Sequence, residues 1–226
     1  SRKLAKALVK TGNNFGVKTE ALLTDMNQPL GKFVGNALEV YECVKLLRGE
    51  ADGHANQTLE LSVELAARML TLTKAEKTLK GAKTKIQAVL DSGAALEKLR
   101  QNIKLQGGDT KICDQPEILF DESLIKVPIK AGETGFVNDI DTKSIGEAVT
   151  AIGGGRVRVA DKIDFAVGYA CEKKLGERIG EHEPLGFLYC RSEAQAAKVL
   201  AKLQMAYKIG DEKPVRKFEL VKEVVN

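Results

Sequence analysis

The sequence predicts an α/β protein in which a sheet covered by helices is followed by a smaller α+β module. An apolar run at residues 21–23 precedes a polar loop and an amphipathic helix, which is the strand, loop and helix order of an α/β unit. Beyond residue 124 the pattern changes to short alternating runs separated by turns. We therefore expect a first domain at residues 1–110, a linker at 111–123 and a second module at 124–226.

Composition limits the classes of function that are open to the chain. Its 226 residues are 43% hydrophobic and 29% charged, as in a globular protein. No apolar run approaches the roughly 20 residues that span a bilayer, and the start has no signal-peptide pattern, so we expect a cytoplasmic protein without a membrane partner. The 35 basic and 31 acidic residues are mixed, aromatic residues are 5% and Trp is absent, which disfavours nucleic-acid binding.

Apolar periodicity predicts the elements of the first domain. Helices are expected from the start to residues 12–14, at 37–47, at 58–72 and, as one long or two shorter helices, at 74–106. If there are two, Ser92 and Gly93 form the break. The helix at 58–72 is so apolar that we expect it to be largely buried. A strand at 21–23 leads into a polar loop and a turn at Pro29 and Gly31.

The second module combines short strands with two helices. Strands are expected at residues 125–129, 135–139, 165–170, 185–189 and 217–225, and helices at 144–152 and 194–208. The segment at 153–156 reads Gly-Gly-Gly-Arg and could cradle a phosphate. A helix-terminating turn is the better interpretation, because these glycines follow a helix, whereas a Walker loop precedes one and ends in Gly-Lys-Ser/Thr.

The loop after the first strand is the best candidate site. In an open α/β sheet, ligands bind at the carboxyl ends of strands, and the helix that follows offers free N–H groups. Asp25 and Asn27 could support a substrate cleft there through indirect hydrogen bonds, or they could only shape the turn. Elsewhere, His54 and His182 are expected to be surface loop residues, no GxSxG elbow exists, and the four isolated cysteines indicate reduced thiols.

Several motifs resemble one known family. The run ALLTDMNQPLG at 21–31, followed by GNALEV at 35–40, is similar to the pyrimidine nucleoside phosphorylases, which include thymidine phosphorylase. LDSGAALE at 90–97, QGGD at 106–109 and GGGR at 153–156 follow in the family's order and spacing. The resemblance covers only the C-terminal half or so of that family. It implies that residues 1–110 are part of the family's central α/β domain.

The end of the chain carries a second likeness. Residues 168–189 resemble the sandwich-like hammerhead of biotinyl and lipoyl carriers, although the Met-Lys or Asp-Lys motif of a modified lysine is absent. Because the phosphorylase family ends in a module of this kind, we expect a hammerhead-like module without a swinging cofactor.

The family resemblance also implies a reaction. Members cleave pyrimidine nucleosides or deoxynucleosides with phosphate as co-substrate, giving a free base and (deoxy)ribose 1-phosphate, in nucleoside salvage and as homodimers. Their phosphate-loop and base-binding residues lie upstream of the position that matches Ser1. We therefore assign no catalytic residue here and expect the chain alone to be inactive, with an exposed apolar surface where the remainder is lacking. The alternative is a non-catalytic binding or structural module that keeps the scaffold.

A potassium ion is implied by the same resemblance. By spacing, its ligands in this chain would be the backbone oxygens of Leu30 and Phe33 and the carboxylate of Glu42. The other interpretation places Glu42 on the solvated face of its helix.

Overall fold

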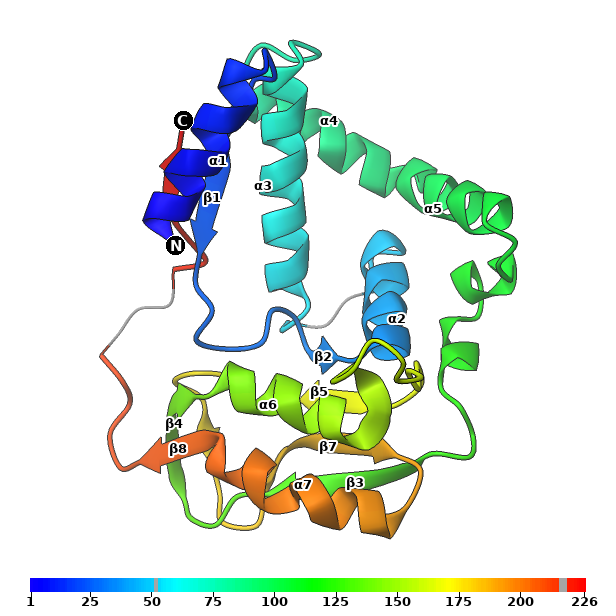
Figure 1. Cartoon of the computed structure of the whole chain (residues 1–226), viewed down its shortest axis with the longest axis vertical. Helices are drawn as coiled ribbons and strands as arrows, with labels where there is room; N and C mark the ends of the chain where they lie inside the picture. The colour runs from blue at the N-terminus through cyan, green and yellow to red at the C-terminus, as the bar shows by residue number, and fades with distance from the viewer. Residues whose placement is uncertain (51–52, 216–218) are drawn as a thin grey trace.

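The computed structural model describes residues 1–50, 53–215 and 219–226. Figure 1 shows a helical first part above a second part in which two helices cover antiparallel strands. The helices are α1 (Arg2–Asn14), α2 (Asn36–Leu47), α3 (Asn56–Leu72), α4 (Leu79–Asp91), α5 (Ala94–Leu105), α6 (Thr142–Val149) and α7 (Glu193–Met205). The strands are β1 (Ala21–Thr24), β2 (Phe33–Val34), β3 (Ile125–Lys130), β4 (Gly135–Ile140), β5 (Gly168–Cys171), β6 (Arg178–Ile179), β7 (Pro184–Cys190), β8 (Tyr207–Gly210) and β9 (Val221–Val225).

The described strands form three small sheets. Their orders are β2-β5-β7-β3, β6-β4-β8 and β1-β9, and every pairing is antiparallel. The prediction that the chain combines helices and sheets in a mixed α/β fold is therefore confirmed. The expected placement of β1 in an open α/β sheet does not appear among the described residues, where β1 pairs with β9.

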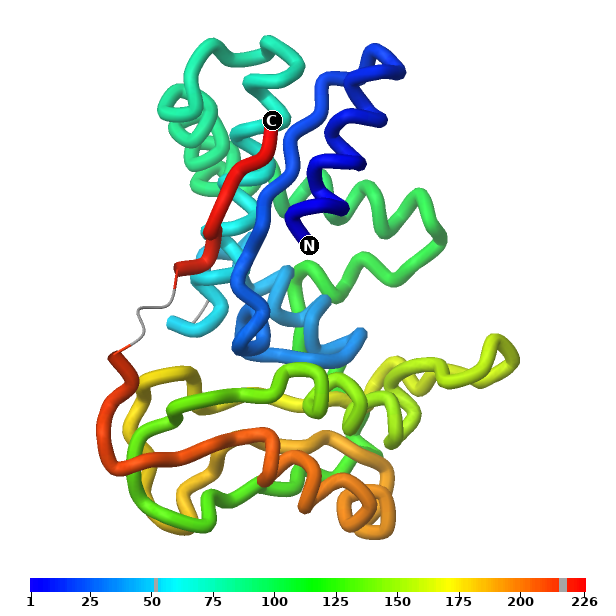
Figure 2. Tube along the Cα trace, turned by 60° about the vertical axis from the view of Figure 1, so that its left-hand side comes forward, coloured from blue at the N-terminus to red at the C-terminus, as the bar shows by residue number. Residues whose placement is uncertain are grey.

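Two strand pairs join the first and second parts of the chain. β2 pairs with β5 of the second part, with Phe33 opposite Ala170. β9 returns to the first part, with Val225 opposite Ala21, and Figure 2 shows this end of the chain running beside the strand. The strand expected at 217–225 thus begins at Val221, and residues 217 and 218 lie outside the described residues. These crossings place the loop after β1 at the junction of the two parts.

The main hydrophobic core lies in the second part, between the four-stranded sheet and the helices α6 and α7. Its largest fully buried side chains include Tyr169, Ile129, Ile145, Leu188 and Leu203. Around α1, by contrast, the buried cluster consists of Ala5, Val9 and Val225. Burial in the described structure is thus concentrated in the second part.

The prediction that the helix at 58–72 is largely buried is wrong. Within α3 only Ala67 is fully buried, and Leu65 and Met69 are 44% and 66% exposed. Its apolar residues extend around much of the helix, whereas α4 packs along one side. Leu4 and Leu8 on α1 are 63% and 58% exposed, so the first part does present an apolar surface.

Other elements lie close to the positions that the sequence predicts. The break between α4 and α5 falls at Gly93, which has φ +73°. After α6, one π-helical turn at Thr150–Gly154 ends at the glycine run, where Gly153 has φ +101° and Arg156 is exposed. The glycine run is therefore a helix-terminating turn, as expected. The helix expected at 194–208 stops at Met205, because the following residues pair with β4 as strand β8.

The region expected to be a linker contains two short 3₁₀ helices, Thr110–Cys113 and Pro116–Leu119, which pack against α5 and α2. The four cysteines are unpaired, with Cys43 exposed and the others buried. Within the described ranges, no helix combines the length and apolar character needed to cross a membrane.

Candidate functional site

The loop after β1 folds back over α2 as a tight turn. Gly31 has φ +68°, a conformation that side-chain-bearing residues rarely adopt, and a Cβ atom at this position would overlap the carboxylate of Glu42. Gly35, with φ +141°, precedes α2, and a Cβ there would lie 2.7 Å from the carbonyl oxygen of Val167. Glycine at these two positions therefore lets the turn approach both α2 and the second part of the chain.

Glu42 fixes this turn from inside α2. Its side chain is buried, with the residue 6% exposed. Oε2 accepts hydrogen bonds from the backbone N–H groups of Lys32 at 2.7 Å and Phe33 at 3.1 Å, and Oε1 accepts one from the Thr58 hydroxyl at 2.8 Å. The interpretation of Glu42 as a solvated surface residue is therefore wrong. The carboxylate connects the turn, α2 and α3.

The three residues expected to bind potassium border one cavity. A space of about 300 Å³ is lined by Pro29, Leu30, Phe33, Val34, Glu39, Glu42, Cys43, Thr58 and Thr142. The last of these belongs to α6, so both parts of the chain contribute to the wall. Turn backbone, the Glu42 carboxylate and two threonine hydroxyls offer hard oxygen donors, the kind that alkali and alkaline-earth cations prefer. The residues present therefore fit a cation of this type.

A side-chain cage for a transition metal is not found here. Among the described residues, no three His, Cys, Asp or Glu side chains are grouped so that they could hold a metal ion. A cation in the cavity would be held by oxygen atoms, as in the set of Leu30, Phe33 and Glu42 that the family resemblance implies. That ligand set stays a prediction.

Asp25 and Asn27 lie at the start of the turn and contact each other. Oδ1 of Asp25 accepts hydrogen bonds from the backbone N–H of Asn27 at 2.7 Å and from its side-chain amide. Oδ2 lies 2.6 Å from the ammonium of Lys222 on β9. Burial alone would raise the pKa of Asp25, but the hydrogen bonds from Lys222 and Asn27 outweigh burial and lower the pKa below its usual 3.8.

These contacts are those of a turn-shaping pair. They bring Asp25 and Asn27 into contact and add Lys222, which the sequence did not indicate. Their expected support of a substrate cleft stays a prediction.

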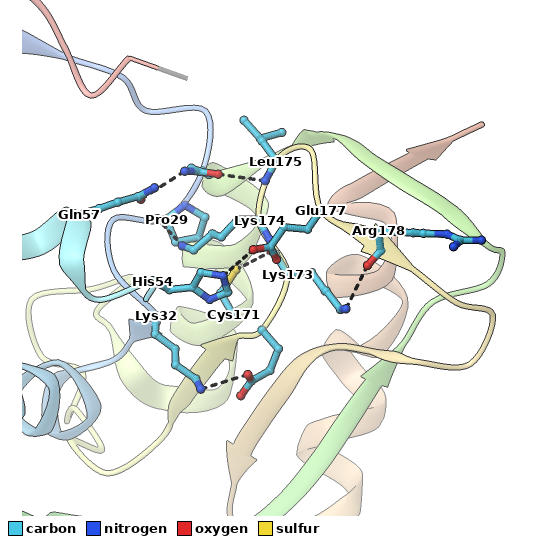
Figure 3. Close-up of polar contacts among 12 residues, drawn as sticks. Pro29, Lys32, His54, Gln57, Cys171, Lys173, Lys174, Leu175, Glu177 and Arg178 are labelled. Atoms are coloured by element: carbon cyan, nitrogen blue, oxygen red, sulfur yellow. Dashed lines mark hydrogen bonds and ion pairs between the residues drawn. The ribbon is translucent and has the colours of Figure 1, made fainter. Parts of the chain in front are cut away.

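The second part of the chain contacts the turn through the loop that follows β5 (Figure 3). The buried ammonium of Lys174 donates to the carbonyl oxygens of Pro29, at 2.6 Å, and Gly31. Gln28 accepts from the backbone N–H of Leu175 at 3.0 Å and donates to Gln57 at 3.2 Å. The turn is therefore held from α2, from α3 and from the loop after β5.

His54 also belongs to this junction. It lies in a turn, as expected, but its side chain is only 23% exposed and its Nε2 atom lies 2.8 Å from Oε1 of Glu177. His182, with a 75% exposed side chain, does lie on the surface. Sequence periodicity could not reveal Lys174 or His54, because both act through contacts with residues far away along the chain.

A larger cavity of about 470 Å³ lies between α3 and β9 and is lined by Gln57, Glu60, Glu64, Lys83, Glu219, Leu220 and Val221. Glu64 there already binds Arg68 and Lys83. Because Leu30, Phe33 and Glu42, the residues expected to bind potassium, line the smaller cavity, we take the smaller one as the candidate site.

Known families match both parts of the chain. Residues 1–96 match the model described as "Glycosyl transferase family, a/b domain", and residues 136–210 match the "Pyrimidine nucleoside phosphorylase C-terminal domain". The first match relates residues 1–96 to the α/β domain of a glycosyltransferase family.

Similar proteins of known name indicate a particular family within this class. The "Pyrimidine-nucleoside phosphorylase" of Bacillus subtilis is 40% identical over 209 residues, which are 92% of this chain and 47% of the relative. The "Thymidine phosphorylase" proteins of Burkholderia cenocepacia and Burkholderia orbicola are 36% and 37% identical over 211 residues, 93% of this chain and 48% of each relative. The chain belongs to the pyrimidine nucleoside phosphorylase family, in its C-terminal portion. It spans about half the length of these relatives.

Proposed function

We propose that this chain forms one side of the active site of a pyrimidine nucleoside phosphorylase. Phosphate attacks the anomeric carbon of a pyrimidine (deoxy)nucleoside, the N-glycosidic bond breaks, and the products are the free base and (deoxy)ribose 1-phosphate. The transition state has oxocarbenium character, so the enzyme must hold phosphate and nucleoside in line and stabilise charge on the departing base. We assign the phosphate and base contacts to the part of the relatives that this chain does not match.

The observation that carries this proposal is the position of Glu42. A buried carboxylate under a glycine turn, beside a cavity lined by Leu30 and Phe33, is a suitable donor set for potassium. The backbone oxygens of Leu30 and Phe33 and the carboxylate of Glu42 would hold the ion. When bound, it supplies positive charge near the phosphate anion. The chain's own residues keep the turn in place, through the Lys32 and Phe33 amides and the Thr58 hydroxyl.

Asp25 and Asn27 have a supporting role in this proposal. By fixing the start of the turn against Lys222 of β9, they set where the turn enters the substrate cleft. We further propose that the segment at 168–189 belongs to a hammerhead-like module that carries no modified lysine. The complete enzyme is a cytoplasmic homodimer of nucleoside salvage in this proposal.

The test is complementation with a relative. This chain would be joined to the part of the Bacillus subtilis protein that it does not match, and release of uracil or thymine from uridine or thymidine would be measured. We expect release that requires phosphate and is accompanied by equimolar pentose 1-phosphate. The Bacillus subtilis protein itself is the positive control, and the chain alone, which we expect to be inactive, is the negative control.

One other function is favoured by a specific observation. Both oxygens of the Glu42 carboxylate accept internal hydrogen bonds, which is also what a scaffold without catalysis would need. If the joined protein folds and dimerises but releases no base, the non-catalytic binding or structural module is the better description.

A further inference from the structure

Lys174 is one of the few buried charged residues in the described structure, with only 4% of its surface exposed. It lies in the loop after β5, and its ammonium reaches the turn between β1 and β2, about 145 positions earlier. There it donates to the carbonyl oxygens of Pro29 and Gly31. Burying an ammonium costs free energy unless hydrogen bonds replace its water, so these contacts constrain the turn as well as the lysine.

The loop that carries Lys174 is itself anchored on both sides. Oε2 of Glu177 accepts from the backbone N–H of Lys174 at 2.9 Å, and Oε1 of the same carboxylate contacts His54 at 2.8 Å. The next residue, Leu175, donates its N–H to Gln28 at 3.0 Å. Figure 3 shows these residues converging on the turn from β5 and from the start of α3. The ammonium is therefore presented from a fixed backbone.

We propose that Lys174 is a positioning residue for the candidate cation cavity. Its ammonium fixes the carbonyls of Pro29 and Gly31, and this sets the orientation of the Leu30 peptide between them relative to Glu42. The importance of that orientation for catalysis rests on the proposed function. The contact itself means that the loop after β5, like Thr142 of α6, brings the second part of the chain to a site whose remaining residues lie between Pro29 and Thr58.

Hydrogen exchange on this chain tests the positioning role directly. The N–H groups of Lys32 and Phe33 report on the turn, because both are bonded to Glu42. In Lys174→Met, which keeps the apolar stem and removes the charge, we expect these two amides to exchange about tenfold faster or more. Amides of strand β3 should change less than about twofold, since β3 pairs with β7 and opens with the second part rather than with the turn.

The neighbouring lysine provides a matched control. The ammonium of Lys173 binds Glu183 at 2.6 Å and the carbonyl oxygen of Arg178 at 3.1 Å, on the side of the loop that leads to β6. Lys173→Met should therefore leave exchange at Lys32 and Phe33 unchanged. Lys174→Arg keeps a cationic donor and should recover most of the protection, which a role in packing alone would not explain.

The joined protein described above adds a functional measurement. In Lys174→Met, the potassium concentration for half-maximal activity should rise about tenfold, with kcat at saturating potassium nearly unchanged. Uniform acceleration of exchange in the whole chain, or no acceleration at the turn, would overturn the positioning role. If the wild-type joined protein is inactive while the turn amides respond as expected, the proposed function fails and the positioning role stands.

Discussion

The carboxylate of Asp25, at the end of β1, lies 2.6 Å from the ammonium of Lys222 in the closing strand β9. The Asp25 side chain is 3% exposed, whereas that of Lys222 is 40% exposed, so the lysine brings a partly solvated charge to a buried acid. The backbone N–H of Asp25 also donates to Leu220 at 2.9 Å. The closing strand β9 is therefore connected to the start of the turn that borders the candidate site.

Asp25→Asn should destabilise the protein. The amide carries no charge to pair with the Lys222 ammonium, and its NH2 group must face another donor, either that ammonium or the N–H groups of Asn27. We expect the free energy of unfolding to fall by about 1–3 kcal/mol, measured by urea denaturation at pH 7. Asp91→Asn, at the exposed end of α4, is the control and should change it by less than about 0.5 kcal/mol.

The stabilisation by Asp25 should depend on pH. Its pKa in the folded protein is lowered below the usual 3.8, so the unfolded chain binds the proton more readily. The contribution is therefore complete above the unfolded pKa and is lost as the pH falls through the folded pKa. We expect the difference in stability between wild type and Asp25→Asn to shrink between about pH 5 and pH 3. A difference that grows toward acid would contradict this assignment.

Gly31→Ala should be far more costly than alanine at another left-handed glycine. Gly93 has a similar φ of +73°, but a Cβ there meets nothing within 4 Å. Gly93→Ala therefore measures the backbone cost alone, about 1–2 kcal/mol. At Gly31 the added methyl overlaps Glu42 and Thr58, and we expect a further loss of about 1–3 kcal/mol in thermal or urea unfolding. Equal losses at the two sites would show that Glu42 does not occupy its described position.

Glu42→Ala should destabilise the turn more than Glu42→Gln does. Alanine leaves two backbone N–H groups and the Thr58 hydroxyl without their acceptor, at a cost of about 1–3 kcal/mol for each buried donor left unpaired. Glutamine keeps one oxygen for the two N–H groups, and its amide can donate to the hydroxyl.

The control for Glu42 is Glu39, one helical turn earlier. It is exposed and accepts a single long hydrogen bond from Gly35 at 3.3 Å, so Glu39→Ala should cost less than about 1 kcal/mol. Urea unfolding of Glu42→Ala, Glu42→Gln and Glu39→Ala would give the free energy of unfolding of each variant. If Glu39→Ala lowers the free energy of unfolding as much as Glu42→Ala, the hydrogen bonds of Glu42 are not what holds the turn.

Local patterns predicted the long elements and the position of the turn. The strand before Asp25, the glycine at position 31 and the helix that carries Glu42 could be located because apolar spacing and turn residues act over a few positions. The two-residue strands β2 and β6 could not, since two residues have no periodicity. The exposure of Met69 was missed because burial depends on what packs against a helix, and its own sequence does not specify that.

Local patterns in the sequence could not predict the polar partners of the turn either. Lys222, Lys174 and His54 come from separate segments, and only the fold brings each to its partner. The resemblance to a family did select Glu42, but it did not predict that this residue is buried. The reason for the burial is the pair of N–H groups at Lys32 and Phe33.

The most direct measurement is the location of a bound monovalent cation. Crystals of the joined protein would be soaked in thallium(I), a potassium substitute with a strong anomalous signal, with phosphate present. We expect a peak within bonding distance of the backbone oxygens of Leu30 and Phe33 and of the Glu42 carboxylate, and no peak there in Glu42→Ala. Thallium that binds only outside this cavity, in an enzyme that potassium activates, would contradict the assignment of the turn as the cation side of the site.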